Sequence, residues 1–382
     1  MPPVNLLIKP ASGLCNMECD YCFYCDETEK RKQASYGFMS KETLANVIRK
    51  ALSYGEQSVG IAFQGGEPTL CGIDFFEEAV RCVKQYNGNN LKIEYALQTN
   101  GYAITEEWCE FFKKNHFLVG LSVDGMEGTH DKYRHSKNGE GTYQKVLQAA
   151  RLMKKSGVDF NILTVVNRET AENIVPIYKE YKRNGWEYLQ FIACLDPLGE
   201  TRGQREYSLT PKAYGEFLIK LFHLWYKDWK RGKQPFIRQF ENYIGIMLKY
   251  EPESCEQRGI CGIQNVVEAD GGVYPCDFYV LDEFKLGNLN QDTMAKIQER
   301  RSEIGFVDRS LNHSEDCRQC RWFSLCRGGC YRCREGVVDN YFCESYRMFF
   351  ENCFTQMEEI SRFLLATRYI GAGDGRGFHN IK

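Results

Sequence analysis

Short β-rich runs and segments of helical periodicity alternate through roughly the first half of the chain, and this alternation restricts the fold more than any other feature. The runs lie at residues 4–8, 59–63, 93–97, 118–123, 160–166 and 188–192. Amphipathic segments such as 40–54, 74–86 and 143–156 lie between them. Repeated strand–helix units favour a parallel sheet with right-handed crossovers. We therefore expect an α/β fold, a partial (β/α)6 barrel of the TIM type.

Polar or glycine-containing loops follow five of these predicted strands. They lie at residues 15–22, 64–68, 98–101, 122–125 and 194–197. In barrels of parallel strands the reacting groups lie at the carboxyl ends of the strands. We expect the five loops to share one mouth and to form the functional site.

The first of these loops contains Cys15, Cys19 and Cys22 in the spacing C-x3-C-x2-C. Three thiolates from one loop can converge on one face of an iron–sulfur cube and leave its fourth iron without a protein ligand. Catalytic metals keep such an open position, whereas electron-carrying clusters are usually closed by four cysteines. A zinc site, a disulfide pair and a lipoprotein cysteine are the alternatives. They fit less well, because zinc motifs favour paired ligands and because Lys9 and Pro10 interrupt the preceding apolar run.

Composition argues against several classes of function. The chain has 49 basic and 51 acidic residues, a net charge of -2 at pH 7 and 18 cysteines. This balance gives no electrostatic reason to expect nucleic acid or an anionic membrane as a partner. No apolar run approaches the roughly 20 residues that span a bilayer, and no secretory signal is recognisable, so we expect a cytoplasmic protein. Because that compartment is reducing, most of the cysteines are not expected in disulfides, which indicates metal binding.

The regular alternation ends before the last third of the chain, where cysteines become frequent. Ten of the 18 cysteines lie at or after Cys255. Their density predicts a small, loop-rich module that metal holds together. We expect a barrel over residues 1–235, a cysteine-rich domain with a C-terminal helix over residues 236–370, and a flexible glycine-rich tail over residues 371–382. A zinc site is the alternative for Cys317 to Cys330, because C-x2-C is common in zinc sites.

The cysteine triad, combined with Gly65-Gly66-Glu67-Pro68 after the second strand, resembles the radical S-adenosylmethionine superfamily. The resemblance implies that the amino and carboxylate groups of S-adenosylmethionine chelate the open iron, and that the glycine-rich strand end receives the amino group. Glycines suit this task because their backbone can approach a ligand closely. The residues that the resemblance assigns to S-adenosylmethionine are Tyr21, Gly66, Ser122, Arg134 and Leu195. Ordinary packing is the alternative for Tyr21 and Leu195, and a solvated loop charge is the alternative for Arg134.

The cysteine-rich region resembles the SPASM domain of peptide-modifying radical enzymes. Its spacings are Cys261-x9-Gly271-x4-Cys276 and Cys317-x2-Cys320-x5-Cys326-x3-Cys330. The resemblance implies two auxiliary clusters and therefore three 4Fe-4S clusters in all. By the family pattern, the nearer cluster has the ligands Cys255, Cys261, Cys276 and Cys330, and the farther cluster has Cys317, Cys320, Cys326 and Cys343. Cys343 is preferred as the last ligand for its context, Phe342-Cys343-Glu344-Ser345-Tyr346, and Cys333 and Cys353 stay open as alternatives.

Within this superfamily, the chain is most similar to anaerobic sulfatase-maturating enzymes, over nearly its whole length. The likeness rests on residues 7–12, 22–24, 63–69, 97–101 and 274–279. It implies oxygen-independent oxidation of a cysteine or serine, in an unfolded sulfatase polypeptide with a C/S-x-P-x-R motif, to Cα-formylglycine. It also implies a 5'-deoxyadenosyl radical that removes a Cβ hydrogen, Asp277 as the base and the auxiliary clusters as electron acceptors.

Substrate contacts and partners are also expected. Tyr24, Gln98 and Asn100 follow strands at the expected mouth, where their hydrogen-bonding groups could hold a substrate backbone or, alternatively, the loops themselves. The expected electron donor is a flavodoxin or ferredoxin, and the expected state is a monomer. Two alternative functions remain. One is another SPASM peptide maturase, for example one that forms thioether crosslinks. The other is a non-catalytic metal-binding or electron-transfer protein.

Overall fold

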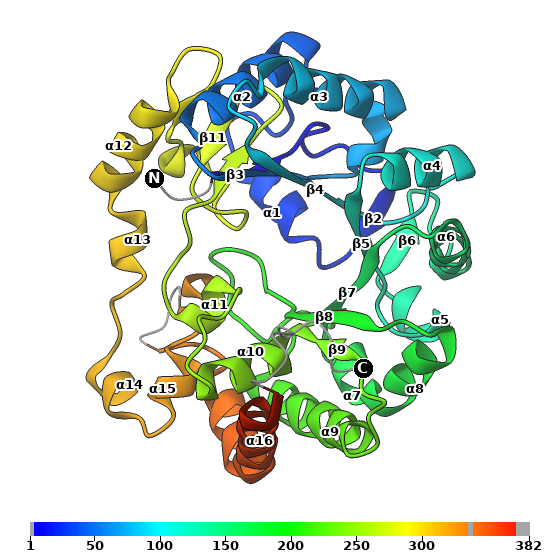
Figure 1. The fold of residues 1–382 in the computed structure, drawn as a ribbon, viewed down its shortest axis with the longest axis vertical. Helices are drawn as coiled ribbons and strands as arrows, with labels where there is room; N and C mark the ends of the chain where they lie inside the picture. Colours follow the sequence, from blue (N-terminus) through cyan, green and yellow to red (C-terminus); the bar gives the residue numbers. More distant parts are fainter. Residues whose placement is uncertain (1–3, 335–338, 372–382) are drawn as a thin grey trace. The chain divides into compact units, whose positions relative to one another are not determined.

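The computed structural model describes residues 4–334 and 339–371 of the chain. It contains two compact units (Figure 1). Unit 1 comprises the residues up to Leu163, Leu195–Arg205 and Gly262–Arg309. Unit 2 comprises Thr164–Cys194, Glu206–Cys261 and the residues from Ser310 onward. Both units are therefore assembled from separate stretches of the sequence.

A parallel sheet forms the centre of unit 1. Its main strands are β1 (Val4–Ile8), β3 (Ser58–Phe63), β4 (Lys92–Thr99), β5 (Phe117–Ser122) and β7 (Phe160–Val166), of which β7 runs on into unit 2. Neighbouring strands pair in parallel in the order β1-β3-β4-β5-β7. Their carboxyl ends therefore lie at one edge of the sheet, the edge from which the loops with the predicted site residues emerge.

Three strands from the cysteine-rich region extend the same sheet. β10 (Asn265–Val267) pairs in parallel with β1, with Leu6 opposite Asn265. β11 (Gly272–Tyr274) and β12 (Gly287–Asn288) follow as antiparallel neighbours. This region was expected to be a loop-rich module, but part of it is a continuation of the sheet. The loop that contains Asp277 therefore follows a strand of that sheet.

Helices and one small sheet complete unit 1. The two short strands β2 (Met17–Cys19) and β6 (Arg134–Ser136) pair antiparallel. The helices are α1 (Phe23–Glu29), α2 (Lys41–Tyr54), α3 (Ile73–Tyr86), α4 (Glu106–Lys114), α5 (Glu127–His130), α6 (Tyr143–Ser156), α12 (Met294–Ile304) and α13 (Phe306–Arg309), with short 3-10 turns η1 (Pro68–Cys71) and η2 (Asp282–Phe284). Ser40 starts α2 as predicted, because its side chain accepts a hydrogen bond from the Thr43 amide.

The core of unit 1 lies between the sheet and these helices. Phe63 and Phe117 contribute from the strands, and Phe76 and Phe112 contribute from α3 and α4; all four are buried. The rings of Phe63 and Phe76 meet edge to face, with centroids 5.0 Å apart. This packing fixes the strands that carry the site loops.

Unit 2 is mainly helical. β8 (Tyr188–Ala193) pairs in parallel with β9 (Phe236–Ile237). The helices are α7 (Arg168–Glu172), α8 (Ile174–Asn184), α9 (Pro211–Trp229), α10 (Arg238–Met247), α11 (Cys255–Arg258), α14 (Glu315–Gln319), α15 (Phe323–Cys326) and α16 (Cys343–Gly371), with the 3-10 turn η3 (Tyr331–Arg334). The long helices α9 and α16 lie side by side, and Phe222 packs edge to face on Phe349 (Figure 1).

The predicted α/β fold is confirmed, and each of the six predicted strands lies within about two residues of an observed one. The predicted domain boundary after residue 235 stays a prediction. The predicted tail, residues 371–382, lies outside the described residues except for Gly371, the last residue of α16. Among the helices that the structure describes, none is both long enough and apolar enough to cross a membrane.

Candidate functional site

The cysteine triad follows β1 and lies on one short stretch of unit 1. Cys15 precedes β2, Cys19 ends β2 and Cys22 is the N-cap of α1. Burial is the main cause that raises the pKa of Cys15 to about 11 and that of Cys19 to about 12, and the charge of Cys22 contributes to both rises. The three thiols are thus close enough to repel one another as thiolates. Such a donor set fits a positively charged multi-iron group, which would remove this repulsion.

Hydrogen-bond donors surround the triad. The Met17 amide donates to Cys15 Sγ at 3.4 Å, and Asn100 Nδ2 lies 3.6 Å from the same sulfur. A hydrogen bond from Cys25 lowers the pKa of Cys22 to about 7. Cys25 is exposed and lies one helical turn after Cys22. Its hydrogen bond therefore stabilises the thiolate form of Cys22, which is the form that a cluster ligand needs.

The Gly65-Gly66-Glu67-Pro68 loop is pressed against the backbone that precedes Cys15. The Gly66 amide donates to Ser12 O and the Glu67 amide donates to Leu14 O, both at 2.8 Å. A Cβ atom on Gly66 would lie only 1.9 Å from Leu14 O, so no larger residue fits without moving backbone. Gly65 adopts a φ of 128°, which favours glycine. The two loops expected to hold S-adenosylmethionine and its cluster are therefore one packed assembly.

The Glu67 side chain connects this assembly to the residues at the end of β4 through hydrogen bonds. Its carboxylate is 1% exposed and accepts hydrogen bonds from the Thr69 and Thr99 hydroxyls and from the amides of Thr69 and Asn100. The Asn100 side chain in turn donates to Asn16 Oδ1 at 2.8 Å. Asn100, a predicted substrate contact, thus lies at the cysteine loop. The sequence showed Glu67 within the motif, but its role as an anchor was missed.

Tyr21 and Arg134 share a buried carboxylate, Asp124, which the sequence reasoning missed. Arg134 Nε donates to Asp124 Oδ2 at 2.8 Å, and the Tyr21 hydroxyl donates to the same oxygen. The guanidinium also lies over the Tyr21 ring, 5.4 Å from its centroid. The alternative of a solvated loop charge is therefore wrong for Arg134, because its side chain is 9% exposed and ion-paired. Asp124 could have been noticed as the only acid in the loop after β5.

The remaining predicted contacts lie near the same strand ends. Gln98 lies over Gly120, where no Cβ would fit, and donates to Ser122 Oγ at 3.0 Å. Leu195 is half-buried and begins the unit 1 stretch Leu195–Arg205. Ser122 and Gln98 therefore form one hydrogen-bonded pair.

Asp277 is held by Lys9 and Gln64, the residues that directly follow β1 and β3. Lys9 Nζ lies 2.5 Å from Asp277 Oδ1, as an ion pair and not as a well-aligned hydrogen bond. Gln64 Nε2 donates to Asp277 Oδ2 at 2.9 Å. Lys9 is fully buried, and its ammonium lies over the Tyr24 ring, 3.7 Å from the centroid. The Lys9 charge also lowers the pKa of Cys22, so this cation acts on both the cysteine loop and the predicted base.

Tyr24 is buried beside Lys9, and none of the described residues provides a hydrogen-bond partner for its hydroxyl. A buried hydroxyl without a partner is uncommon in folded proteins. The Tyr24 hydroxyl is therefore placed to form a hydrogen bond with a bound molecule, as expected for a substrate contact.

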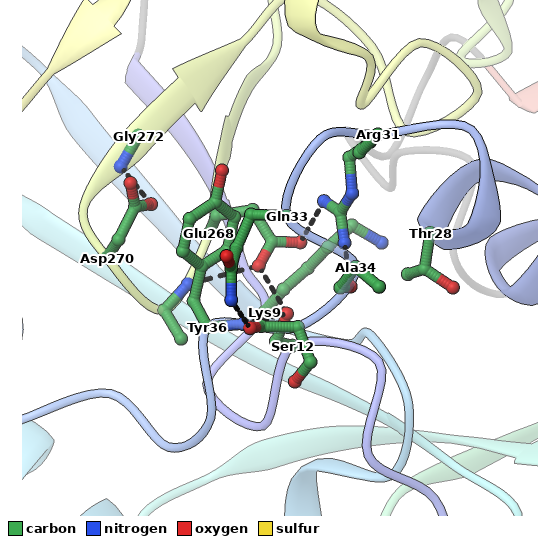
Figure 2. A network of polar contacts seen from close by, with 12 residues as sticks. Lys9, Ser12, Thr28, Arg31, Gln33, Ala34, Tyr36, Glu268, Asp270 and Gly272 are labelled. Carbon is green, nitrogen blue, oxygen red and sulfur yellow. Dashed lines mark hydrogen bonds and ion pairs between the residues drawn. The ribbon is translucent and has the colours of Figure 1, made fainter.

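A second buried charge cluster, centred on Glu268, lies near Lys9 (Figure 2). Glu268 forms an ion pair with Arg31 at 3.0 Å and accepts a hydrogen bond from Ser12 Oγ at 2.8 Å. Burial raises the pKa of Glu268 to about 7, while the charge of Lys9 opposes that rise. The backbone oxygen of Ser12 accepts a hydrogen bond from the Gly66 amide. Glu268 thus connects the strand that extends the sheet to the loop expected to bind S-adenosylmethionine.

The four cysteines predicted for the farther cluster all belong to unit 2, within range of one another's charges. Burial, followed by the charges of the Cys343 and Cys317 thiolates, raises the pKa of Cys326 to about 12. Burial is also the largest cause of the raised pKa of Cys317, and the charges of Cys343 and Cys320 contribute to it. Cys353, in contrast, is buried within α16, with its sulfur 4.0 Å from His223 Nε2. These contacts favour Cys343 over Cys353 as the last member of this group.

The predicted ligands of the nearer cluster come from both units. Cys255, Cys261 and Cys330 belong to unit 2, where burial and then the Cys330 and Cys255 thiolates raise the pKa of Cys261 to about 12. Cys333 forms a hydrogen bond with Cys330, which places it with this group and not with Cys343. Cys276 belongs to unit 1, directly before Asp277.

Two family models match the chain. The radical SAM superfamily model matches residues 10–181, and the model of an iron-sulfur cluster-binding domain matches residues 260–321. They cover the cysteine triad and the first part of the cysteine-rich region.

Known proteins resemble the chain over most of its length. A cysteine-type anaerobic sulfatase-maturating enzyme of Clostridium novyi (strain NT) is 44% identical over 95% of this chain and 99% of its own length. A serine-type anaerobic sulfatase-maturating enzyme of Bacteroides thetaiotaomicron is 30% identical over 95% of this chain and 92% of its own length. The solved structure of native anSMEcpe with bound AdoMet and Cp18Cys peptide matches with a TM-score of 0.91 at 44% identity, covering 95% of this chain and 100% of that one.

Proposed function

The chain belongs to the family of anaerobic sulfatase-maturating enzymes and is a radical SAM enzyme, and from this premise we propose that it oxidises a cysteine of a sulfatase polypeptide to Cα-formylglycine without oxygen. The observation that carries the proposal is the Lys9–Asp277 ion pair, which holds a carboxylate beside the loop of the cysteine triad. Serine is the second candidate substrate. The identity of 44% to a cysteine-type relative, against 30% to a serine-type one, supports cysteine.

The proposed cofactors are S-adenosylmethionine and three 4Fe-4S clusters. Cys15, Cys19 and Cys22 would hold the first cluster, which together with S-adenosylmethionine would supply a 5'-deoxyadenosyl radical for removal of a Cβ hydrogen from the substrate. The Tyr21–Asp124–Arg134 group and Gly66 shape the pocket for this cofactor, together with Ser122 and Leu195. The close approach of the Gly66 backbone supports this placement.

Asp277 is the proposed base for the thiol proton. Lys9 and Gln64 fix its two carboxylate oxygens, so the group does not need to reorganise when the proton arrives. With reference pKa values of about 3.9 for aspartate and 8.5 for cysteine, transfer from an ordinary thiol would be uphill by about 6 kcal/mol. The radical on the adjacent carbon acidifies the thiol and reduces this difference. Loss of the proton and one electron leaves a thioaldehyde, which water hydrolyses to the aldehyde with release of hydrogen sulfide.

In this proposal an auxiliary cluster would accept the electron that leaves the substrate. Cys255, Cys261, Cys276 and Cys330 would hold the nearer cluster, and Cys317, Cys320, Cys326 and Cys343 would hold the farther one. Cys276 is adjacent to Asp277 in the sequence, so proton and electron would leave toward neighbouring residues. A flavodoxin or ferredoxin supplies the electron that starts the reaction.

Tyr24 is the best supported of the proposed substrate contacts, because its buried hydroxyl has no partner among the described residues. The amides of Gln98 and Asn100 already donate to Ser122 and Asn16, and they would offer their remaining groups to an unfolded C-x-P-x-R segment. A monomer suffices for all of these contacts within the proposal.

The experiment compares C-x-P-x-R and S-x-P-x-R peptides after anaerobic incubation with reconstituted enzyme, S-adenosylmethionine and a reductant. Mass spectrometry follows the aldehyde, and chromatography follows 5'-deoxyadenosine. The cysteine peptide is expected to react faster. Asp277→Asn is expected to reduce aldehyde formation by about 10²-fold or more while 5'-deoxyadenosine still forms. Asp270→Asn, in the neighbouring β10–β11 turn, is the matched control (Figure 2).

Three outcomes would contradict parts of the proposal. Full activity of Asp277→Asn would show that Asp277 is not the base. Production of 5'-deoxyadenosine with both peptides unchanged would keep the radical chemistry and discard the substrate. If protein shown to contain its clusters forms neither product, the remaining interpretation is an electron-transfer protein.

A further inference from the structure

Arg301 is a buried arginine near the end of α12, and its side chain is directed at the backbone beside Cys276. The residue is 5% exposed. Its guanidinium donates to Gln264 O at 2.6 Å, to Asn265 Oδ1 at 2.9 Å and to Gln298 Oε1 at 2.9 Å. A fourth, longer contact of 3.5 Å reaches Pro275 O, one residue before Cys276. All four acceptors are neutral.

No carboxylate among the described residues pairs with this guanidinium, which distinguishes it from the buried arginines Arg31 and Arg134. A buried cation without a counter-ion is costly, and burial lowers the pKa of Arg301 to about 10. The only charge that opposes this effect is the Cys276 thiolate, which stabilises the guanidinium. Arg301 therefore remains charged at neutral pH, and its counter-charge is a predicted cluster ligand.

Hydrogen bonding alone does not explain the charge. Arg301 ties α12 to the start of β10 and to the end of β11 through neutral oxygens, and a neutral amide could make several of these contacts. With a pKa of about 10, the guanidinium keeps its proton at neutral pH, so the positive charge is retained there. Its place beside Cys276 is then an electrostatic feature and not only a packing feature.

We infer that Arg301 is a fixed positive charge that raises the reduction potential of the cluster bound through Cys276. This inference rests on the ligand set given under the proposed function. When the substrate radical loses its thiol proton to Asp277, one electron must leave as the C=S bond forms. The cluster that accepts this electron gains one negative charge. A buried cation nearby stabilises the reduced cluster more than the oxidised one, and local charge is one of the terms that set cluster potentials.

The test is an anaerobic potentiometric titration of the fully loaded enzyme, followed by electron paramagnetic resonance. Arg301→Gln removes the charge and keeps an amide that can donate to the same oxygens. We expect one of the three cluster signals to shift to a more negative potential and the other two to stay unchanged. Arg301→Lys keeps a positive charge and is expected to shift less. Arg300→Gln, the exposed neighbour that pairs with Glu303, is the matched control and is expected to shift nothing.

Asn265→Asp provides an independent route to the same result. It places a carboxylate at the oxygen that Arg301 contacts at 2.9 Å, so it cancels the charge while the arginine stays in place. This variant decides the question if Arg301→Gln does not retain its iron. The expected result is again a negative shift of the same single signal.

A cluster ligand variant separates the two levels of the proposal. Cys276→Ala should abolish or alter the signal that Arg301→Gln shifts. If Cys276→Ala changes no cluster signal, the proposed ligand set is wrong. If Cys276→Ala removes one signal but neither Arg301→Gln nor Asn265→Asp shifts it, the ligand set stands and the inference about Arg301 is overturned.

Discussion

Lys9→Met is expected to destabilise the protein strongly, because it leaves Asp277 as a largely buried carboxylate without its cation. The side chains of Lys9 and Asp277 are 0% and 15% exposed, and their charged atoms lie 2.5 Å apart. Removing one partner of a buried ion pair typically costs about 3–5 kcal/mol. Asp277 keeps the hydrogen bond from Gln64 and some contact with solvent. We therefore expect the lower end of that range, about 3 kcal/mol.

The assay is anaerobic thermal unfolding of the loaded enzyme, followed by circular dichroism at one fixed scan rate. At about 2–4 °C per kcal/mol for domains of this size class, the melting temperature of Lys9→Met should fall by about 6–12 °C. The double variant Lys9→Met/Asp277→Asn removes both charges, so it should be more stable than Lys9→Met alone. Lys92→Met, which removes a lysine with a 74% exposed side chain, is the control and should change stability by less than about 0.5 kcal/mol.

Two results would refute this reasoning. One is a Lys9→Met variant as stable as the Lys92→Met control. The other is a double variant in which the two losses simply add, because charges in contact must show a coupling energy. Either result would mean that the ion pair does not hold Asp277 in place.

Further substitutions test other parts of the site. Gly66→Ala should abolish S-adenosylmethionine binding, measured by equilibrium dialysis, because its Cβ would lie 1.9 Å from a backbone oxygen. Asp124→Asn leaves the buried Arg134 guanidinium without its carboxylate and should weaken the same binding by at least about tenfold, or about 1.4 kcal/mol; unchanged affinity would remove this group from the pocket. Cys343→Ala should lose the iron of one cluster, measured by iron and sulfide content, whereas Cys353→Ala should retain it.

The strands could be predicted because their signal is local. A run such as residues 160–166 is rich in β-branched residues and lies between two helical segments, and the observed β7 has the same bounds. The cysteine groups could be predicted for a similar reason, since their spacing is written within short stretches. The pairing of β10 with β1 had no such signal, because Leu6 and Asn265 are neighbours only after the chain has folded.

The charge partners of the site were beyond sequence reasoning for the same reason. Lys9 was seen as an interruption of an apolar run and as part of the family likeness, although a lysine at the end of a buried strand is a candidate for a buried ion pair. Its partner Asp277 comes from a distant stretch of the chain. Asp124, in contrast, lies in a loop that the strand pattern had already placed at the site, and it needed only to be matched with Arg134, ten residues away.

Hydrogen abstraction from the substrate cysteine is the central step of this account, and isotope transfer tests it most directly. A C-x-P-x-R peptide whose cysteine carries two deuterium atoms on Cβ is incubated anaerobically with the enzyme, S-adenosylmethionine and a reductant. The account predicts one deuterium in each 5'-deoxyadenosine and one deuterium left on the aldehyde carbon. Aldehyde formed together with unlabelled 5'-deoxyadenosine would contradict it.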